Sequence, residues 1–297
     1  MSNKLRKMTL EKKHNLTGWA FLAPATFLIA VFSFWPMIKA LVLSFQTGKG
    51  RNMQMAGFTN YIRMFQDDVF IQSIKNTFFY FILQVPIMLV VALVLACILN
   101  KKDLRFKGFF RTMIFVPCTT SLVAYSIIFR SLFANNGLVN YVLVNIGILD
   151  KPYNFLTQPF AAKMVIILAL LWRWTGYNMV FFLSGLQNIE YSVYEAAKID
   201  GASAIQTFFK ITVPLLKPTI LLTAIMSTNG TLQLFDESIN LTDGGPANAS
   251  ISMSHYIYNL CFKYVPNFGY AAAMSFFILL LVAVLAFIQM RVGDKRD

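Results

Sequence analysis

Long apolar runs separated by short polar segments dominate the chain. Each run has about the 20 residues that a helix needs to cross roughly 30 Å of hydrocarbon. Several contain Pro or Gly, which spanning helices tolerate better than soluble ones. The runs lie near Thr17–Phe45, Asn76–Leu99, Thr112–Ala134, Phe160–Leu186, Thr219–Leu241 and Phe268–Met290. The pattern predicts an all-α integral membrane protein with six transmembrane helices.

Composition supports a membrane protein. Of the 297 residues, 57% are hydrophobic and only 13% are charged, whereas charged residues make up about a quarter of a soluble domain. A basic tail precedes the first run, but that run is too long for a signal peptide and no small-residue cleavage site closes it. The first run is therefore expected to remain as an uncleaved helix.

Basic residues set the expected orientation, because cytoplasmic loops retain Lys and Arg. With the amino terminus inside, the inner segments hold 16 of the 26 Lys and Arg residues and the outer segments hold 7. Both termini are thus expected in the cytoplasm, with residues 1–16 as a cytoplasmic tail. The net charge of +13 follows from the same bias. It indicates no nucleic-acid partner, because no basic patch is interleaved with exposed aromatics on a soluble face.

One segment, residues 191–214, is far more polar than its surroundings. Ser192 with Glu195, and Ser203 with Gln206, have the spacing of capping boxes, in which a hydroxyl and a carboxyl or amide satisfy amides of the first helical turn. The spacing predicts two short helices in a cytoplasmic loop. From these residues alone, the pair is either a docking site for a cytoplasmic partner or an amphipathic segment lying on the lipid.

The ends of these two helices are also marked. Gly201 can take the left-handed conformation that closes a helix, so the first helix is expected to end at Asp200 and Gly201. The second is expected to run to about Val213 and to be stopped by Pro214.

Several kinds of site are missing from the sequence. No glycine-rich phosphate loop with Lys-Ser or Lys-Thr is present, so the chain is not expected to bind ATP. No His and Glu spacing typical of a metal site occurs, and no metal ligands are predicted. Acids within the apolar runs are scarce, which argues against a proton relay. The three cysteines, Cys97, Cys118 and Cys261, predict no disulfide framework.

Arg173 lies in the middle of the fourth run, where a cation costs at least about 2.5–3.5 kcal/mol on insertion scales. It is therefore expected to face protein or water. In one interpretation it lines a substrate pathway with Trp172, Tyr177 and Asn178, which offer stacking faces and hydrogen bonds suited to a sugar. In the other, Arg173 is anchored to a neighbouring subunit or extends to the interface.

Three further positions are candidates for the same pathway. Gln233 and Asp236 in the fifth run are placed to face the cavity, although Asp236 is equally suited to capping the outer helix end. Tyr125 is a weaker candidate, because an aromatic residue in a spanning helix usually serves packing. The sequence Gly244–Pro246 predicts a tight turn, with contact to a binding protein as the alternative.

The polar segment resembles the signature loop of permease subunits in ATP-binding-cassette importers, whose pattern is EAA, two residues, DGA, eight residues and I-x-L-P. Val213 replaces the usual Leu. Flanking segments, such as LWRWTGYNMVFFLSGLQNIE and LFDESINLTDGGPAN, resemble the maltose, multiple-sugar and glycerol-3-phosphate branch, and the resemblance covers roughly residues 17–290. The residues that match the signature are Glu195, Ala196, Ala197, Asp200, Gly201, Ala202, Ile211 and Pro214.

This resemblance implies a type I importer permease fold in a bacterial cytoplasmic membrane, and a protein that is not an enzyme. Residues 1–297 would form one permease domain, with a core at 70–290 and a coupling loop at 187–217. The implied partners are a second homologous permease, two ATPase subunits that bind ATP and Mg²⁺, an extracytoplasmic solute-binding protein, a sugar and membrane lipid. It also favours Asp236 as a pathway residue.

Two other classes of protein are alternatives. A secondary transporter driven by ions or protons would need acids within the membrane and inverted repeats, and a membrane-embedded enzyme would need clustered His, Asp or Glu within its helices. Neither pattern is clear in this sequence.

Overall fold

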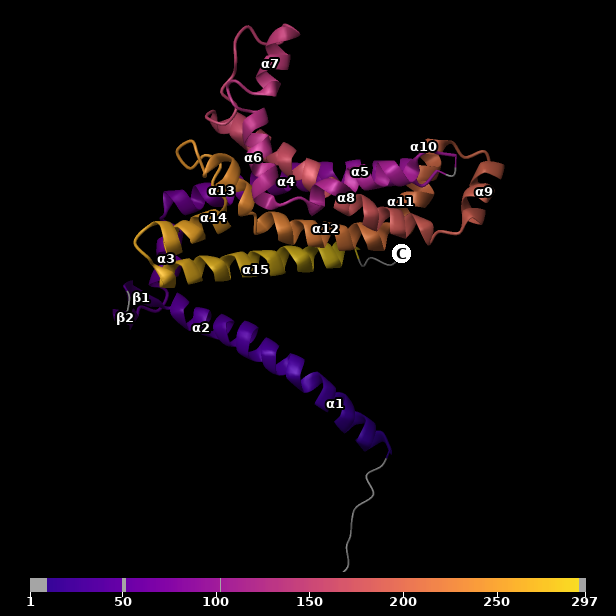
Figure 1. Ribbon diagram of the computed structural model, residues 1–297. Coiled ribbons are helices and arrows are strands. Elements are labelled where there is room, and N and C mark those ends of the chain that lie inside the picture. The colour runs from indigo at the N-terminus through magenta and orange to yellow at the C-terminus, as the bar shows by residue number, and fades with distance from the viewer. Residues whose placement is uncertain (1–9, 50–51, 102, 294–297) are drawn as a thin grey trace, which may run out of the picture.

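The computed structural model describes residues 10–49, 52–101 and 103–293. The first nine residues of the basic tail and residues 294–297, both expected in the cytoplasm, lie outside this range. The described chain is mostly helical, with one antiparallel hairpin in which Gln46 pairs with Met55. Figure 1 shows a bundle of long helices with shorter ones at its ends.

The helices and strands follow one another in a simple order. The α-helices are α1 (Leu10–Ile29), α2 (Trp35–Ser44), α3 (Thr59–Met64), α4 (Asp68–Leu99), α5 (Lys107–Thr119), α6 (Leu122–Leu132), α7 (Leu138–Asn145), α8 (Pro159–Gln187), α9 (Tyr191–Ile199), α10 (Ala204–Thr207), α11 (Val213–Leu215), α12 (Lys217–Leu232), α13 (Asp236–Thr242), α14 (Met253–Tyr258) and α15 (Phe268–Gly293). Strands β1 (Gln46–Lys49) and β2 (Asn52–Met55) form the hairpin, and π-helical turns occupy Ala30–Phe34, Phe208–Thr212 and Asn259–Lys263.

The prediction of six spans is confirmed in outline, with two corrections. Within the described residues, four helical stretches are long and apolar enough to cross a membrane: His14–Ser44, α4, α8 and α15. The other two spans are bent pairs, α5 with α6 at 99° and the 204–215 segment with α12 at 70°.

The third run was expected to be one helix, but it breaks at Thr120 and Ser121. Both residues have extended backbone, and Pro117 in the last turn of α5 has no N–H to donate to the preceding turn. The fifth run was expected to continue to Leu241, but α12 ends at Leu232 and Asp236 begins the separate helix α13.

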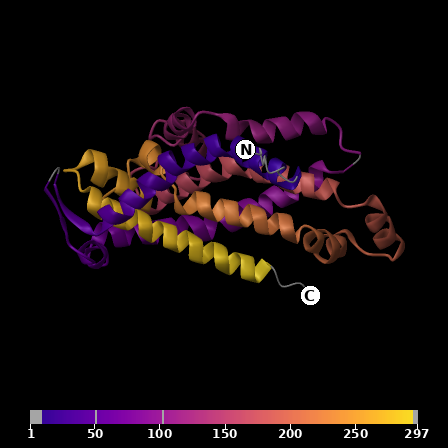
Figure 2. The ribbon, with the colours of Figure 1, turned by 90° about the horizontal axis from the view of Figure 1, so that it is seen from below.

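The centre of the bundle is built on α8. It packs against α4, α5 and α12, and α12 packs in turn against α15; Figures 1 and 2 show these long helices lying lengthwise beside one another. Small residues allow the closest approaches between helices in membranes. At Gly176 of α8, a Cβ would collide with the carbonyl group of Ile114 in α5. This glycine therefore sets the distance between α5 and α8.

The first span stands apart from the bundle. In Figure 1, α1 leads away from the other helices, and only α2 approaches the bundle, where it packs against α15. None of the most apolar window of this span is buried by the rest of the chain. Large side chains such as Trp19, Phe27 and Phe32 are exposed along it.

The two ends of the bundle differ in content. Helices α9 and α10 lie at one end, together with the carboxyl end of α15. At the opposite end lie α3, α13, α14 and the hairpin (Figure 1). This second end is fastened by Asp67, which caps α4 through Oδ1, while its Oδ2 accepts hydrogen bonds from the hydroxyl groups of Tyr256 at 2.7 Å and Tyr270 at 2.8 Å.

Candidate substrate cavity and exposed helix pair

A cavity of about 520 Å³ lies between α4, α8, α12 and the start of α13. This volume is within the 300–1,000 Å³ range of small-molecule sites. Aliphatic side chains line much of it, among aromatic, amide, hydroxyl and carboxyl groups. The aromatic and polar lining residues are Gln84, Trp174, Tyr177, Asn178, Ser227, Thr231, Gln233, Phe235, Asp236 and Glu237.

Hydrogen bonds between helices fix the polar groups of this cavity. Thr231 of α12 donates to Oε1 of Gln84 of α4 at 2.8 Å. Ser227 of α12 donates to Oδ1 of Asn178 at 3.3 Å, and Asn178 donates to the carbonyl of Trp174 at 3.1 Å. The amides are thus oriented by neighbours, as required in a site that recognises hydroxyl groups.

The structure divides the predicted pathway residues into two groups. Tyr177, Asn178, Gln233 and Asp236 all line the cavity. Trp172, Arg173 and Tyr125 do not. Trp172 is exposed on the other side of α8, beside α5.

Arg173 is held at the break between α5 and α6. Its side chain is buried, and its guanidinium donates to the carbonyl of Thr120 at 2.9 Å and to that of Cys118 at 3.5 Å. Backbone carbonyls freed at the end of a helix must find donors inside a membrane protein. The arrangement supports the anchoring interpretation of Arg173, with a partner in its own chain.

Tyr125 of α6 connects Arg173 to the edge of the cavity. Its ring lies 4.9 Å from the Arg173 guanidinium, and its hydroxyl donates to Oε1 of Glu237 in α13. Glu237 is buried, and it was not among the candidate site residues expected from the sequence. Ser227, Thr231 and Trp174 also line the cavity and were not predicted as site residues. For Ser227 and Thr231, a signal was available in the cluster of small polar residues STNGT within an apolar run.

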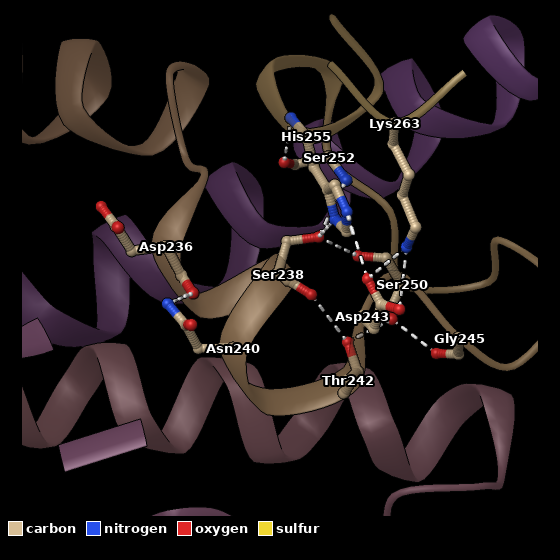
Figure 3. A network of polar contacts seen from close by, with 10 residues as sticks. All are labelled: Asp236, Ser238, Asn240, Thr242, Asp243, Gly245, Ser250, Ser252, His255 and Lys263. Atoms are coloured by element: carbon tan, nitrogen blue, oxygen red, sulfur yellow. Dashed lines mark hydrogen bonds and ion pairs between the residues drawn. The ribbon is translucent and has the colours of Figure 1, made fainter. Parts of the chain in front are cut away.

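A network of hydroxyl groups holds the segment after α13 (Figure 3). Oγ of Ser238 lies 2.9 Å from Nδ1 of His255 and 3.1 Å from the Ser250 carbonyl, to which it donates. His255 is fully buried, and its Nε2 lies 3.7 Å from Asp243, which pairs with Lys263 at 3.0 Å. Burial lowers the pKa of His255 to about 4, although the negative charge of Asp243 acts in the opposite direction.

The predicted turn at Gly244–Pro246 is present in this network. Gly244 has φ of +74°, and its amide donates to the carbonyl of Ser238 at 3.0 Å. The Gly245 amide donates to the carbonyl of Thr242 at 2.9 Å. The turn brings Asp243 to His255, as Figure 3 shows.

The predicted helix pair is present as α9 and α10, but its first capping box is not. Glu190 caps α9 without a side-chain bond, and Ser192 donates to Glu190 at 3.3 Å rather than accepting from an amide. The helix starts before Ser192, so this residue has helical backbone and cannot act as its cap. The second capping box, Ser203 with Gln206, is confirmed.

Gly201 closes α9 as expected. Its φ is +73°, and the amides of Gly201 and Ala202 donate to the carbonyls of Lys198 and Ala197. This double hydrogen bond is a Schellman motif, in which glycine avoids the cost of a left-handed residue.

Pro214 does not stop the second helix. It lies within α11, which continues to Leu215, because the π-helical turn at Phe208–Thr212 takes up the irregularity before it. Glu195, Ala196 and Asp200 are exposed on this helix pair. Ala197 is buried and Ala202 half-buried.

The helix pair also exposes large apolar side chains. Ile199 is 86% exposed, and Ile205 and Phe209 are 71% and 65% exposed. The described residues of the chain leave these side chains uncovered, which fits either a protein partner or lipid.

Comparison with known proteins agrees with this arrangement. Residues 67–296 match the family described as binding-protein-dependent transport system inner membrane component. The chain belongs to this family. It is therefore an inner-membrane transport subunit that crosses the membrane several times, and it is not an enzyme.

Relatives and solved structures agree with this transport family over nearly the whole chain. The permease is 51% identical to the lactose transport system permease protein LacF of Rhizobium radiobacter, over 98% of each chain. It is 33% identical to the multiple sugar-binding transport system permease protein MsmF of Streptococcus mutans, over 97% of this chain and 99% of the other.

The fold is that of an ABC importer permease. A bacterial ABC transporter that imports the acidic polysaccharide alginate matches with a TM-score of 0.85 at 24% identity, covering 97% of this chain and 98% of the other. A second structure, of an alginate ABC transporter in complex with an alginate pentasaccharide-bound periplasmic protein, matches with a TM-score of 0.84 at 25% identity, covering 96% of each chain.

Proposed function

We propose that this permease forms half of the translocation pathway of an ATP-driven sugar importer. The cavity carries the proposal, because it combines aromatic faces, oriented amides and hydroxyl groups, the chemistry that suits a saccharide. Relatives named for lactose and for multiple sugars support a saccharide substrate. Of the pathway residues predicted from the sequence, we propose that four contact the saccharide: Tyr177, Asn178, Gln233 and Asp236.

The α9–α10 pair is proposed to dock a cytoplasmic ATPase subunit, within a coupling loop at residues 187–217 of a single permease domain with its core at 70–290. Three observations support it: the exposed apolar side chains, the Schellman turn at Gly201, and the position of the pair at the end of the bundle opposite α13 and α14 (Figure 1). Both termini are proposed to be cytoplasmic, on the same side as this pair.

The remaining partners are proposed from the uncovered surfaces and from the family. A second homologous permease would complete the pathway and cover part of the first span, which its own chain leaves exposed. Two ATPase subunits would supply ATP hydrolysis, and an extracytoplasmic binding protein would deliver the sugar. ATP-dependent uptake distinguishes this assembly from an ion-coupled secondary transporter, which would work without an ATPase.

The experiment is uptake of a labelled neutral disaccharide by proteoliposomes that contain the assembled importer and its binding protein. Asn178→Ala should lower uptake about five- to tenfold, since loss of an oriented hydrogen-bonding group costs about 1 to 1.5 kcal/mol. Leu168→Ala, on the same helix but outside the cavity, is the control and should transport normally. Normal uptake by Asn178→Ala and Gln233→Ala, or uptake without ATP, would contradict the proposal.

A further inference from the structure

The cavity carries two adjacent carboxyl groups and no positively charged group. Asp236 and Glu237 line it, and none of its other lining residues is Lys, Arg or His. Glu237 is 4% exposed and accepts a hydrogen bond from Tyr125. Asp236 is half-buried, and its carboxylate forms no hydrogen bond or ion pair with any residue in the described part of the chain. These carboxyls therefore face the cavity without a neutralising cation.

The nearest basic group is engaged elsewhere. Arg173 directs its guanidinium to the carbonyls of Thr120 and Cys118, at the break between α5 and α6. Tyr125 lies between Arg173 and Glu237: its ring is near the Arg173 guanidinium, and its hydroxyl donates to Glu237. Arg173 thus supports the position of Glu237 through Tyr125, and it is not available as a ligand for an anion in the cavity.

A cavity with low-dielectric walls strengthens the effect of this charge. Two unit charges interact about four times more strongly at an effective dielectric constant near 20 than in bulk water, and clefts lined by one sign of charge focus the field. An entering anion would lose hydration, meet a like charge and find no cation. A neutral saccharide would instead donate a hydroxyl group to an ionised carboxylate of this pair in a charge-assisted hydrogen bond.

We propose that Asp236 and Glu237 restrict this cavity to uncharged saccharides and reject anionic ones, such as uronates and sugar phosphates. The proposal rests on the transport function proposed above and assigns its substrate class. One ionised carboxylate of the pair is sufficient to repel an anion. Tyr125 acts as a positioning residue, because its hydroxyl donates to Glu237. The alginate importer, described as importing an acidic polysaccharide, shares the fold. The present permease should differ from it in the charge of this cavity.

The test measures the potential in the cavity without relying on the binding protein, which has its own selectivity. Single cysteines replace Ser227 and, separately, Tyr177 in a chain whose native Cys97, Cys118 and Cys261 are changed to Ser. The assembled importer in proteoliposomes is treated with cationic and anionic methanethiosulfonates of similar size. Each rate is divided by that reagent's rate with a free small thiol, so the ratio of the two reports the local potential.

The cationic reagent should react at least about tenfold faster than the anionic one at both positions. Glu237→Gln and Asp236→Asn should together lower this ratio severalfold, and at least one should do so alone. Asp68→Asn is the control: it removes an exposed carboxyl in the first turn of α4, outside the cavity, and should leave the ratio unchanged. A neutral disaccharide should slow both reagents equally.

Two results would overturn different parts of this scheme. Equal rates for the two reagents, or a ratio that the double change leaves intact, would refute the charge selection while leaving the sugar route in place. Cysteines that neither charged nor neutral reagents can reach, in any state of the transport cycle, would remove the cavity from the route. That second result would refute the proposed role of the cavity as well.

Discussion

Oγ of Ser238 lies 2.9 Å from Nδ1 of the buried His255, and this contact joins α13 to α14. The helix that begins at Asp236 is thereby tied to the segment that follows the Gly244 turn (Figure 3). The position of the cavity carboxyls thus depends on an imidazole that has no access to solvent. Protonation of His255 should therefore lower the stability of this end of the bundle.

The stability of the permease should fall as pH decreases from 6.5 to 4. His255 titrates near 6.5 in an unfolded chain and near 4 in the folded one, so in this window the unfolded chain binds a proton that the folded chain excludes. The loss should reach up to about 1.4 kcal/mol per pH unit, and above pH 6.5 His255 should add no pH dependence. Thermal inactivation midpoints of the purified complex across this range provide the measurement.

His255→Gln should flatten that part of the pH profile, because glutamine does not titrate, although it lowers the midpoint at neutral pH. His14→Gln, at an exposed position on α1, is the matched control and should keep the wild-type slope. An unchanged slope in His255→Gln would show that other groups cause the pH dependence.

Gly176→Ala should destabilise the permease by about 1 to 3 kcal/mol. The added Cβ would meet the carbonyl group of Ile114, a backbone contact that cannot be relieved by a side-chain rotation, and overpacking of this kind has this typical cost. Gly108→Ala, in the first turn of α5 where a Cβ meets nothing within 4 Å, should be neutral. Thermal midpoints and folded yield in detergent would compare the two, and equal values would contradict the close packing of α5 on α8.

Gly201→Asp should weaken docking of the ATPase subunit, so that sugar uptake and sugar-stimulated ATP hydrolysis fall together. A side chain at φ of +73° costs about 1 to 2 kcal/mol and loosens the Schellman turn that positions α9 against α10. Retention of the ATPase subunit and sugar-stimulated ATP hydrolysis should fall together, while the membrane helices still insert. Gly147→Asp is the control, because Gly147 has φ of +75° and follows α7, which lies far from α9 and α10 in Figure 1. Full retention in Gly201→Asp would indicate that the pair is a lipid-facing segment.

The proposed orientation predicts a labelling pattern in intact cells. In a chain without native cysteines, a cysteine at the exposed Lys151 should react with a membrane-impermeant thiol reagent, whereas one at the exposed Arg105 should not. The reason is the excess of basic residues in alternate loops. The reverse pattern would place both termini outside.

The spans could be predicted because the length of each apolar run is read directly from the sequence, but the breaks within the third and fifth runs could not. Pro117 lies in the run that contains Thr120 and Ser121, but spanning helices tolerate proline, so it did not predict a break. The bend also depends on a donor, Arg173, that is distant in sequence. The failed cap at Ser192 has a similar origin. The motif was present, but α9 begins at Tyr191 with Glu190 as its cap, two residues before Ser192.

The candidate site was half predicted for the same reason. Tyr177 and Asn178 were identifiable as polar groups in an apolar helix, and they line the cavity. Arg173 was an equally strong candidate, because a cation in lipid costs much free energy, yet its guanidinium donates to a backbone carbonyl at the end of α5. Glu237 was overlooked as a site residue, because its burial results from the separate helix α13, which composition alone does not reveal.

The bond between Arg173 and Thr120 also has a consequence for biosynthesis. The two residues are 53 positions apart, so Thr120 leaves the ribosome and meets the insertion machinery well before its donor has been made. Helix α5 has 13 residues and spans about 20 Å at 1.5 Å per residue, too short to cross the bilayer alone. Until α8 has been made, the Thr120 carbonyl cannot bond to Arg173, so in the nascent third span it needs water, another donor or a straight helix.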